Sequence, residues 1–161
     1  MCGIVGMTGN GITISGLVGA LKKLEYRGYD SAGVAYLSEN KVKVIKSVGK
    51  IMELIKELGD NIDTNIKTGL AHTRWATHGA PNDINAHPQT DCTGKIAVVH
   101  NGIIENYEEI SSYLKDKGHI LDSETDTEVI AHLIEEYFNG DLVDAVRHAL
   151  VDLVGAYAIG V

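Results

Sequence analysis

The sequence has few cysteines, few basic residues and no long apolar segment, and each shortage excludes a class of protein. Two cysteines among 161 residues can form at most one bridge, which excludes a scaffold held by several disulfides. The 14 Lys and Arg are outnumbered by 22 Asp and Glu, which gives a formal charge of −8 without any basic run. We therefore expect neither nucleic acid nor a membrane as a partner. No uninterrupted apolar run approaches the roughly 18 residues of a membrane span.

The expected location and size of the protein follow from the same features. The first basic residue is Lys22, so the N-terminus lacks the charged region of a secretory signal. Together with the low cysteine content, this predicts a soluble protein of the reducing cytoplasm. The sequence has no internal repeat, low-complexity tract or linker composition. A chain of this length can hide roughly 68–70% of its unfolded surface, so we expect one domain with a sizeable core.

Short segments rich in Val and Ile alternate with helical patterns, which is typical of a mixed α and β domain. Strands are expected at residues 3–7, 32–37, 42–48, 70–72, 96–100 and 156–161. Apolar residues recur at helical spacing over 17–24, 129–137 and 142–153. Residues 38–41 read as a hairpin between two strands, so the sheet should be partly antiparallel. The polar segment 76–94 holds both prolines and is expected to be a long functional loop.

Cys2 is the candidate nucleophile because of its position in the chain. If Met1 is removed, one residue carries a thiol with a pKa of about 8.5 and an α-amine with a pKa of about 7.7–8.0. The amine can then take the proton of the thiol without a distant base. The alternative is that Cys2 is a small buried strand residue, since free cysteine is commonly buried. Cys92 lies in the polar loop without a matched base, and we expect it to be a bystander thiol.

Asn101, Gly102 and Arg74 could polarise or bind a substrate. The Asn101-Gly102 pair follows an apolar run, and a tight turn in which both residues have positive φ is one explanation. The other is that the Asn101 amide and the Gly102 backbone N–H are two donors to a developing oxyanion. Arg74 has the side chain best shaped to hold a carboxylate in bidentate fashion, although a surface arginine without a ligand is the alternative.

Asp126 lies in a segment that reads as the start of a helix. The spacing of Thr125 and Glu128 matches a capping box with Thr125 at the N-cap, which would place Asp126 in the first helical turn. The helix dipole alone would explain a carboxylate there. If that helix end faces a cleft, the same carboxylate could receive a substrate ammonium group.

Two other ligand classes are considered and set aside. The four glycines between Gly3 and Gly11 invite a dinucleotide fingerprint, but no strand precedes them. His72, His78, His87 and Cys92 are close in sequence, yet their spacings of six, nine and five residues match no zinc pattern. We therefore predict neither a metal nor a cofactor.

Several motifs taken together resemble the glutaminase domain of the class II glutamine amidotransferases, which are N-terminal nucleophile hydrolases. The matching segments are MCGIVG (1–6), LEYRGYDSAG (24–33), HTRWATHG (72–79), NAHP (85–88), VVHNGIIEN (98–106), SETDTEVIAHL (123–133) and GAYA (155–158). The second, third and sixth of these point to the sugar-phosphate branch, the glutamine:fructose-6-phosphate aminotransferases.

The resemblance implies a fold and a set of site residues. The fold is α+β, an αββα four-layer sandwich that we expect to be incomplete at its C-terminal end, because 156–161 is an apolar strand pattern without a polar tail. The implied roles are a nucleophile and its amine base at Cys2, oxyanion donors at Asn101 and Gly102, carboxylate binding by Arg74, Thr77 and His78, and ammonium binding by Asp126. Trp75 resembles the indole that gates the passage of ammonia, while Arg27 and His87 have no assigned role.

The implied activity is hydrolysis of glutamine to glutamate and ammonia. In the full-length enzyme, further domains would bind fructose 6-phosphate and use the ammonia to form glucosamine 6-phosphate, and that enzyme could be a homodimer. Residues 1–161 would then be a partial glutaminase domain without the sugar-phosphate domains. One alternative is an inactive truncated fragment that only binds glutamine. Another is the glutaminase domain of an amidotransferase with a different acceptor.

Overall fold

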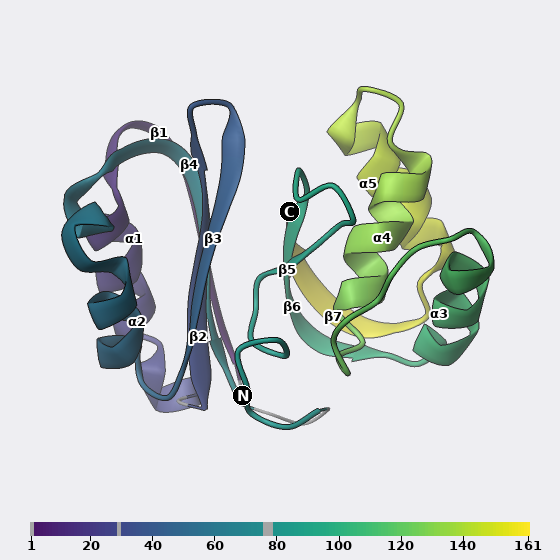
Figure 1. Ribbon diagram of the computed structural model, residues 1–161, viewed down its shortest axis with the longest axis horizontal. Helices are drawn as coiled ribbons and strands as arrows, with labels where there is room; N and C mark the ends of the chain where they lie inside the picture. Colours follow the sequence, from purple (N-terminus) through teal and green to yellow (C-terminus); the bar gives the residue numbers. More distant parts are fainter. Residues whose placement is uncertain (1, 29, 76–78) are drawn as a thin grey trace.

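The chain folds into four layers in the computed structural model, which describes residues 2–28, 30–75 and 79–161 (Figure 1). Two antiparallel sheets face each other in the middle, and helices cover the outer face of each sheet. Each sheet has one face toward its own helices and one toward the other sheet. The expected αββα sandwich is confirmed by this arrangement.

The N-terminal part of the chain forms a four-stranded sheet in the described residues. Its strands, in spatial order, are β1 (Gly3–Thr13), β4 (Asn65–Arg74), β2 (Ser31–Ser38) and β3 (Lys41–Val48). All of its pairings are antiparallel. The predicted hairpin joins β2 to β3, and its two central residues Glu39 and Asn40 have φ angles of 51° and 59°, as a type I′ turn requires.

Helices α1 (Ile14–Lys22) and α2 (Ile51–Leu58) cover the outer face of this sheet (Figure 1). Thr13 caps α1, because its hydroxyl oxygen accepts a hydrogen bond from the Gly16 backbone N–H at 3.1 Å. Short 3₁₀ turns follow the two helices, η1 (Glu25–Arg27) and η2 (Gly59–Asp63). The core between helices and sheet is apolar and includes Leu17, Leu21, Val34, Leu54 and Ala71.

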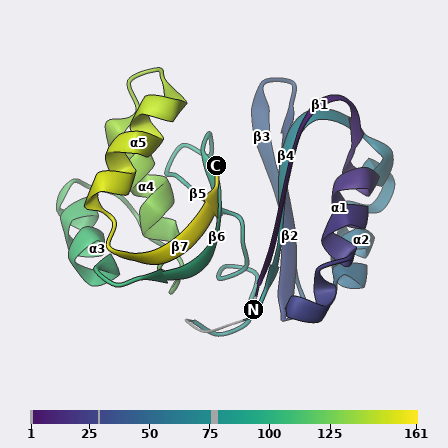
Figure 2. The same cartoon turned by 180° about the vertical axis from the view of Figure 1, so that it is seen from behind.

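The C-terminal part forms the second sheet and its helical cover. The strands are β5 (Gln89–Thr90), β6 (Ala97–Ile104) and β7 (Gly155–Gly160), with β6 in the centre. The covering helices are α3 (Tyr107–Asp116), α4 (Glu128–Tyr137) and α5 (Leu142–Asp152), on the side away from the first sheet (Figure 2). A second apolar core lies here, with Val98, Ile104, Ile130, Ile134 and Ala149 at its centre.

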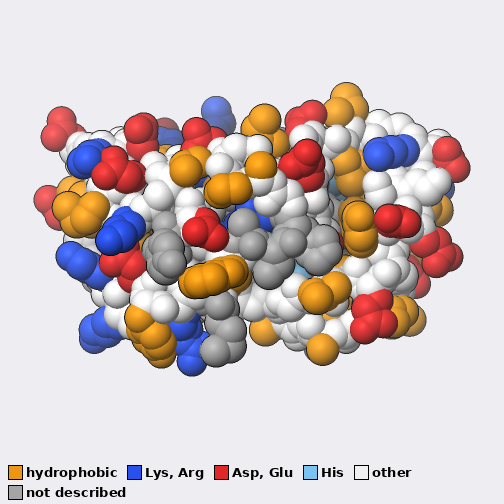
Figure 3. Space-filling view, turned by 90° about the horizontal axis from the view of Figure 1, so that it is seen from below, with side chains coloured by type: hydrophobic (Ala, Val, Ile, Leu, Met, Phe, Trp, Pro, Cys, Tyr) orange, Lys and Arg blue, Asp and Glu red, His pale blue; other side chains and the backbone are white. Residues whose placement is uncertain are grey.

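The surface at the edge of the sandwich carries charges of both signs (Figure 3). Lys and Arg side chains lie mainly on the side of α1 and α2 in that view, whereas Asp and Glu predominate on the side of α3 to α5. Among the residues described, no helix combines the length and the apolar character needed to cross a bilayer.

A substitution at Gly33 on β2 tests how closely the loop before β5 packs on the first sheet. A Cβ added there would lie 2.2 Å from the His87 carbonyl oxygen, so Gly33→Ala must displace that loop. We expect a loss of about 1–3 kcal/mol in the free energy of unfolding, the usual cost of overpacking. Gly19→Ala is the matched control, because nothing lies within 4 Å of its added Cβ on the exposed side of α1. It should stabilise by about 0.5–1 kcal/mol. Urea denaturation of both variants measures this, and equal effects would contradict the close packing.

Candidate active site

Cys2 lies immediately before β1 and beside the end of β4. The antiparallel register pairs Gly3 with Thr73, and the Gly3 backbone N–H donates to the Thr73 hydroxyl at 3.2 Å. The Trp75 backbone N–H donates to the Cys2 sulfur at 3.1 Å. Cys2 is only half-buried, and it lines a small pocket between the two sheets. It is therefore not a thiol enclosed in an aliphatic core.

The pocket beside Cys2 collects the sequence-predicted residues that the structure describes. Its lining comes from residues at the start of β1 and the end of β4, from β6, and from the segments before β5 and α4. The lining residues are Cys2, Arg74, Trp75, His87, His100, Asn101, Gly102, Thr125 and Asp126. Cys2, Arg74, Asn101, Gly102 and Asp126, which are distributed over 125 positions of sequence, thus meet at one place. Thr77 and His78, the other two predicted residues, lie outside the described residues, as does Met1.

The Asn101 side chain is oriented by contacts on both of its ends. Its Nδ2 donates to the Cys2 carbonyl oxygen at 3.2 Å, and its Oδ1 lies 2.9 Å from His72 Nε2. His72 Nε2 also lies 3.1 Å from the His100 carbonyl oxygen and 3.4 Å from His87 Nδ1. Because a backbone carbonyl oxygen can only accept, Nε2 carries the ring proton, and the amide NH₂ group of Asn101 must face Cys2.

Asn101 and Gly102 lie within strand β6, so the tight-turn explanation is wrong. Gly102 pairs with Tyr157 of β7 and has a φ of 131°. A Cβ at Gly102 would lie 2.3 Å from the Ala156 carbonyl oxygen. The close approach of β7 therefore requires glycine at position 102. This requirement is independent of any role of the Gly102 N–H as an oxyanion donor.

Arg74 and Asp126 give the pocket one cation and one anion. Arg74 ends β4 and is 4% exposed, so it is not a surface arginine. Burial lowers the pKa of Arg74 from its ordinary value, and nearby Cys2, Asp126 and Asp30 oppose that shift. Asp126 is 6% exposed, and its Oδ2 accepts from the Ile104 backbone N–H at 2.9 Å. Opposite charges in one small pocket match the ammonium and carboxylate groups of an amino acid.

The predicted capping box is wrong. Helix α4 begins at Glu128 with Thr127 at its N-cap, so Asp126 precedes the helix. The Glu128 carboxylate accepts from the backbone N–H groups of Asp122 and Ser123 at 2.9 and 2.7 Å. The Thr127 hydroxyl lies 2.9 Å from His100 Nδ1. These tertiary contacts replace the local caps.

Three buried histidines lie at the pocket, and the sequence did not reveal them as a group: His87 and His100 line it, and His72 lies behind them in contact with His87. The rings of His72 and His87 lie 4.4 Å apart, and His100 lies 3.8 Å from the Asp126 carboxylate. Burial lowers the pKa of His72 to about 4 and that of His87 well below its ordinary value. Burial also lowers the pKa of His100, against the opposing effect of Asp126. These rings are therefore neutral at pH 7, and they orient polar groups without adding positive charge.

The remaining residues singled out from the sequence lie elsewhere. Arg27 belongs to η1, where its Nε donates to the Tyr26 hydroxyl at 3.1 Å. The prediction that Cys92 lacks a base is wrong, because its sulfur lies 3.5 Å from His119 Nδ1 and 3.4 Å from His132 Nδ1. Trp75 is 43% exposed beside Cys2.

Known proteins are similar to this chain in fold and in sequence. The glutamine phosphoribosylpyrophosphate amidotransferase from B. subtilis superposes with a TM-score of 0.79 at 27% identity, over 99% of this chain and 34% of that one. A structure described as the allosteric regulatory enzyme of purine biosynthesis gives a TM-score of 0.84 at 28% identity, again over 99% and 34%. Residues 59–161 match the family described as glutamine amidotransferase domain. The chain belongs to this family, which confirms the class expected from the motifs.

Curated relatives of high identity include aminotransferases. The glutamine–fructose-6-phosphate aminotransferase (isomerizing) of Thermotoga maritima is 59% identical over 161 residues, which is all of this chain and 26% of that protein. The protein of the same name from Aquifex aeolicus is 56% identical, over all of this chain and 27% of its own length. The chain thus spans about a quarter of the length of these relatives.

The neutral state of His72 makes the stability of the fold depend on pH. The pKa of this ring is about 4 in the folded chain and 6.5 in its ordinary state. Neutral His72 therefore makes its full contribution to the free energy of unfolding above pH 6.5. This contribution, roughly 3 kcal/mol, is lost as the pH falls from 6.5 to 4. His72→Gln keeps a donor for Asn101 but does not titrate. We expect the free energy of unfolding of the variant to fall less steeply over this pH range, by up to about 1.4 kcal/mol per pH unit. Equal slopes in urea titrations would contradict the assignment.

Proposed function

We propose that the chain hydrolyses the side-chain amide of glutamine, with Cys2 as the nucleophile. The observation that carries this proposal is the meeting of a thiol, a fixed amide donor and two opposite charges around one pocket. Membership of the glutamine amidotransferase domain family supports the same chemistry.

In this proposal the two charged residues of the pocket hold the backbone end of glutamine. Arg74 binds the α-carboxylate and Asp126 binds the α-ammonium group, as their burial on the pocket wall favours. Thr77 and His78 are proposed to assist at the carboxylate on the strength of the sequence motif. The side-chain amide of the substrate then points toward Cys2.

The reaction begins once Met1 is removed, because the α-amine of Cys2 is then free. The amine takes the thiol proton, and the sulfur forms a bond to the amide carbon of glutamine. Asn101 Nδ2 and the Gly102 backbone N–H receive the negative charge that develops on the amide oxygen. The protonated amine returns its proton to the leaving nitrogen, and ammonia departs. Water then hydrolyses the γ-glutamyl thioester, which releases glutamate and restores the thiol.

The ammonia would serve a second reaction in a longer protein. We propose that residues 1–161 are part of the glutaminase domain of a glutamine:fructose-6-phosphate aminotransferase, because the chain matches about a quarter of each such relative. We propose that Trp75, which is exposed beside Cys2, borders the route that ammonia takes. The mechanism needs a reduced Cys2, which favours the cytoplasm.

The proposal is tested with Met1-free protein and a diazoketone analogue of glutamine, which alkylates a nucleophilic thiol. We expect one adduct per chain, at Cys2, together with release of glutamate from glutamine. Protein that retains Met1, and the Cys2→Ser variant, should do neither, because each lacks half of the nucleophile and base pair.

Three outcomes would contradict the proposal. The first is an adduct at Cys92, and the second is unchanged turnover in Cys2→Ser. The third is a rise in melting temperature with glutamine but no glutamate release, which would indicate a fragment that only binds glutamine.

A further inference from the structure

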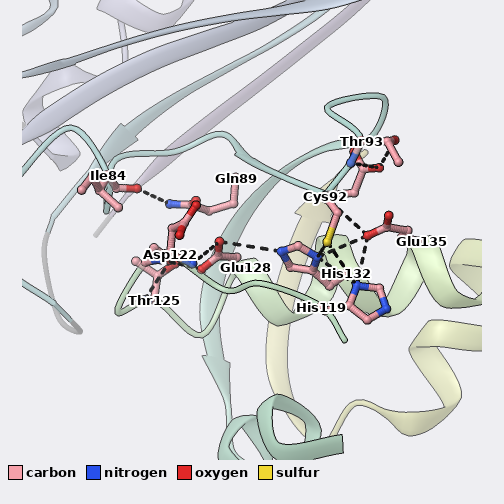
Figure 4. A network of polar contacts seen from close by, with 12 residues as sticks. Ile84, Gln89, Cys92, Thr93, His119, Asp122, Thr125, Glu128, His132 and Glu135 are labelled. Atoms are coloured by element: carbon pink, nitrogen blue, oxygen red, sulfur yellow. Dashed lines mark hydrogen bonds and ion pairs between the residues drawn. The ribbon is translucent and has the colours of Figure 1, made fainter. Parts of the chain in front are cut away.

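A second group of polar side chains lies away from the pocket, beside helix α4 (Figure 4). It consists of Cys92 in the loop after β5, His119 between α3 and α4, and His132 and Glu135 on α4, and we name it the Cys92 cluster. The four candidate ligand atoms all lie within 4.8 Å of one another. The positions on α4 are three residues apart, so both side chains project from one face of the helix.

Five of the six distances within the Cys92 cluster are close to the edges of a small tetrahedron, and the sixth, between the Cys92 sulfur and the Glu135 carboxylate, is at most 4.8 Å. Both His119 Nδ1 and His132 Nδ1 lie close to the Cys92 sulfur, at 3.5 and 3.4 Å. The two nitrogens are 3.2 Å apart, and they lie 3.1 and 3.3 Å from Glu135 Oε2. Metal–ligand bonds of about 2.0–2.3 Å in a regular tetrahedron give edges of about 3.3–3.8 Å.

A carboxylate lies beside the far nitrogen of each imidazole, within hydrogen-bond distance for His119 and slightly farther away for His132. The far nitrogen of His119, Nε2, lies 3.1 Å from Glu136 Oε1, and Nε2 of His132 lies 3.7 Å from Glu128 Oε1. Protons on these Nε2 atoms face the carboxylates, so both Nδ1 lone pairs face the sulfur and Glu135. The carboxylate–histidine–metal arrangement of zinc proteins has this form.

Access to the Cys92 cluster is open from solvent. A cleft of about 500 Å³ runs beside it and is lined in part by Asp91, Cys92, Glu128 and His132. Cys92 itself is exposed, whereas His132 is buried. An ion can therefore reach the ligands without opening the core.

We propose that Cys92, His119, His132 and Glu135 bind one zinc ion in a tetrahedral site. A thiolate and two imidazoles are poor ligands for Mg²⁺ or Ca²⁺ and good ones for Zn²⁺. Four protein ligands leave no open position, so the ion is structural.

The ion would join three segments that already contact one another, for example through the hydrogen bond that the Cys92 backbone N–H donates to Glu135 Oε2 at 3.1 Å. It ties the loop after β5 and the α3–α4 connection to helix α4. From His132 the contacts continue to Glu128, whose carboxylate holds the backbone of Asp122 and Ser123 (Figure 4). That segment leads directly to Asp126 in the pocket. Metal binding therefore stabilises the part of the chain that carries one wall of the candidate active site.

Cobalt is the probe for this site, because Co²⁺ replaces Zn²⁺ and reports its ligands by absorption. The full chain is stripped with a chelator under reducing conditions and titrated with Co²⁺. We expect saturation at one ion per chain, a thiolate-to-cobalt charge-transfer band, and the intense visible bands of tetrahedral cobalt. Zinc should displace the cobalt in a one-to-one ratio and raise the melting temperature.

The two cysteines supply a matched pair of variants. Cys92→Ser should lose the charge-transfer band, whereas Cys2→Ser should keep the band and the stoichiometry. Because Cys2→Ser lacks the thiol of the proposed reaction, its metal binding is read independently of glutamine hydrolysis. Glu136→Gln removes a supporting carboxylate and not a ligand, and it should weaken zinc binding by about 10–100-fold with the tetrahedral spectrum retained.

Three results would overturn the zinc site. These are the absence of stoichiometric uptake by the folded chain, the weak visible spectrum of octahedral cobalt, and a charge-transfer band that persists in Cys92→Ser. Circular dichroism of each apo variant shows whether it is folded. If Cys92→Ser does not fold, the variant His119→Ala is used instead, because His119 is only half-buried. Stoichiometric tetrahedral cobalt binding by His119→Ala would also overturn the zinc site.

Discussion

The hydrogen bond between His72 and Asn101 joins the two sheets at the point where the candidate active site is built. His72 lies on β4 of the first sheet and Asn101 on β6 of the second, with 2.9 Å between Nε2 and Oδ1. Sheets that pack face to face normally bury apolar side chains, so a polar group between them needs a partner. Here His72 and Asn101 are partners of each other, and their hydrogen bond fixes the direction of the Asn101 amide.

The position of Cys2 depends on the same two sheets. The β1–β4 register brings its sulfur to the Trp75 backbone N–H, while Asn101 Nδ2 reaches its carbonyl oxygen from the opposite sheet. The arrangement requires a neutral His72, because a ring with both nitrogens protonated would bring an uncompensated charge into a buried site. Burial of the histidines thus fixes the direction of polar groups, while Arg74 and Asp126 carry the charges that we propose hold an amino acid substrate.

Many of the strands and candidate site residues could be predicted from the sequence, because short local patterns mark them. Val- and Ile-rich runs marked the strands, and residue type together with motif marked Cys2, Arg74 and Asp126, which the pocket brings together. Helices α2 and α3 were not predicted, although Ile51, Leu54 and Leu58 in α2 and Ile110 and Leu114 in α3 have helical spacing. A closer reading of the pattern would have found both.

The features that could not be predicted are set by contacts between distant parts of the chain. Pairing with β7 keeps Asn101 and Gly102 in strand β6, although the dipeptide alone favours a turn. The contact of Thr127 with His100 moves the start of α4 away from the capping box. Cys92 meets His119 and His132 only after three segments fold together, so sequence spacing grouped it with the wrong histidines.

The most direct test of the central claim is a double-mutant cycle on His72 and Asn101, read as kcat for glutamine hydrolysis and checked against the free energy of unfolding. Asn101→Ala should lower kcat by about 10²–10³-fold if its amide stabilises the oxyanion. If His72 acts on the rate by holding that amide, His72→Phe should lower kcat in the native background and change it little when Asn101 is already alanine. An equal loss of kcat from His72→Phe in both backgrounds would contradict the account.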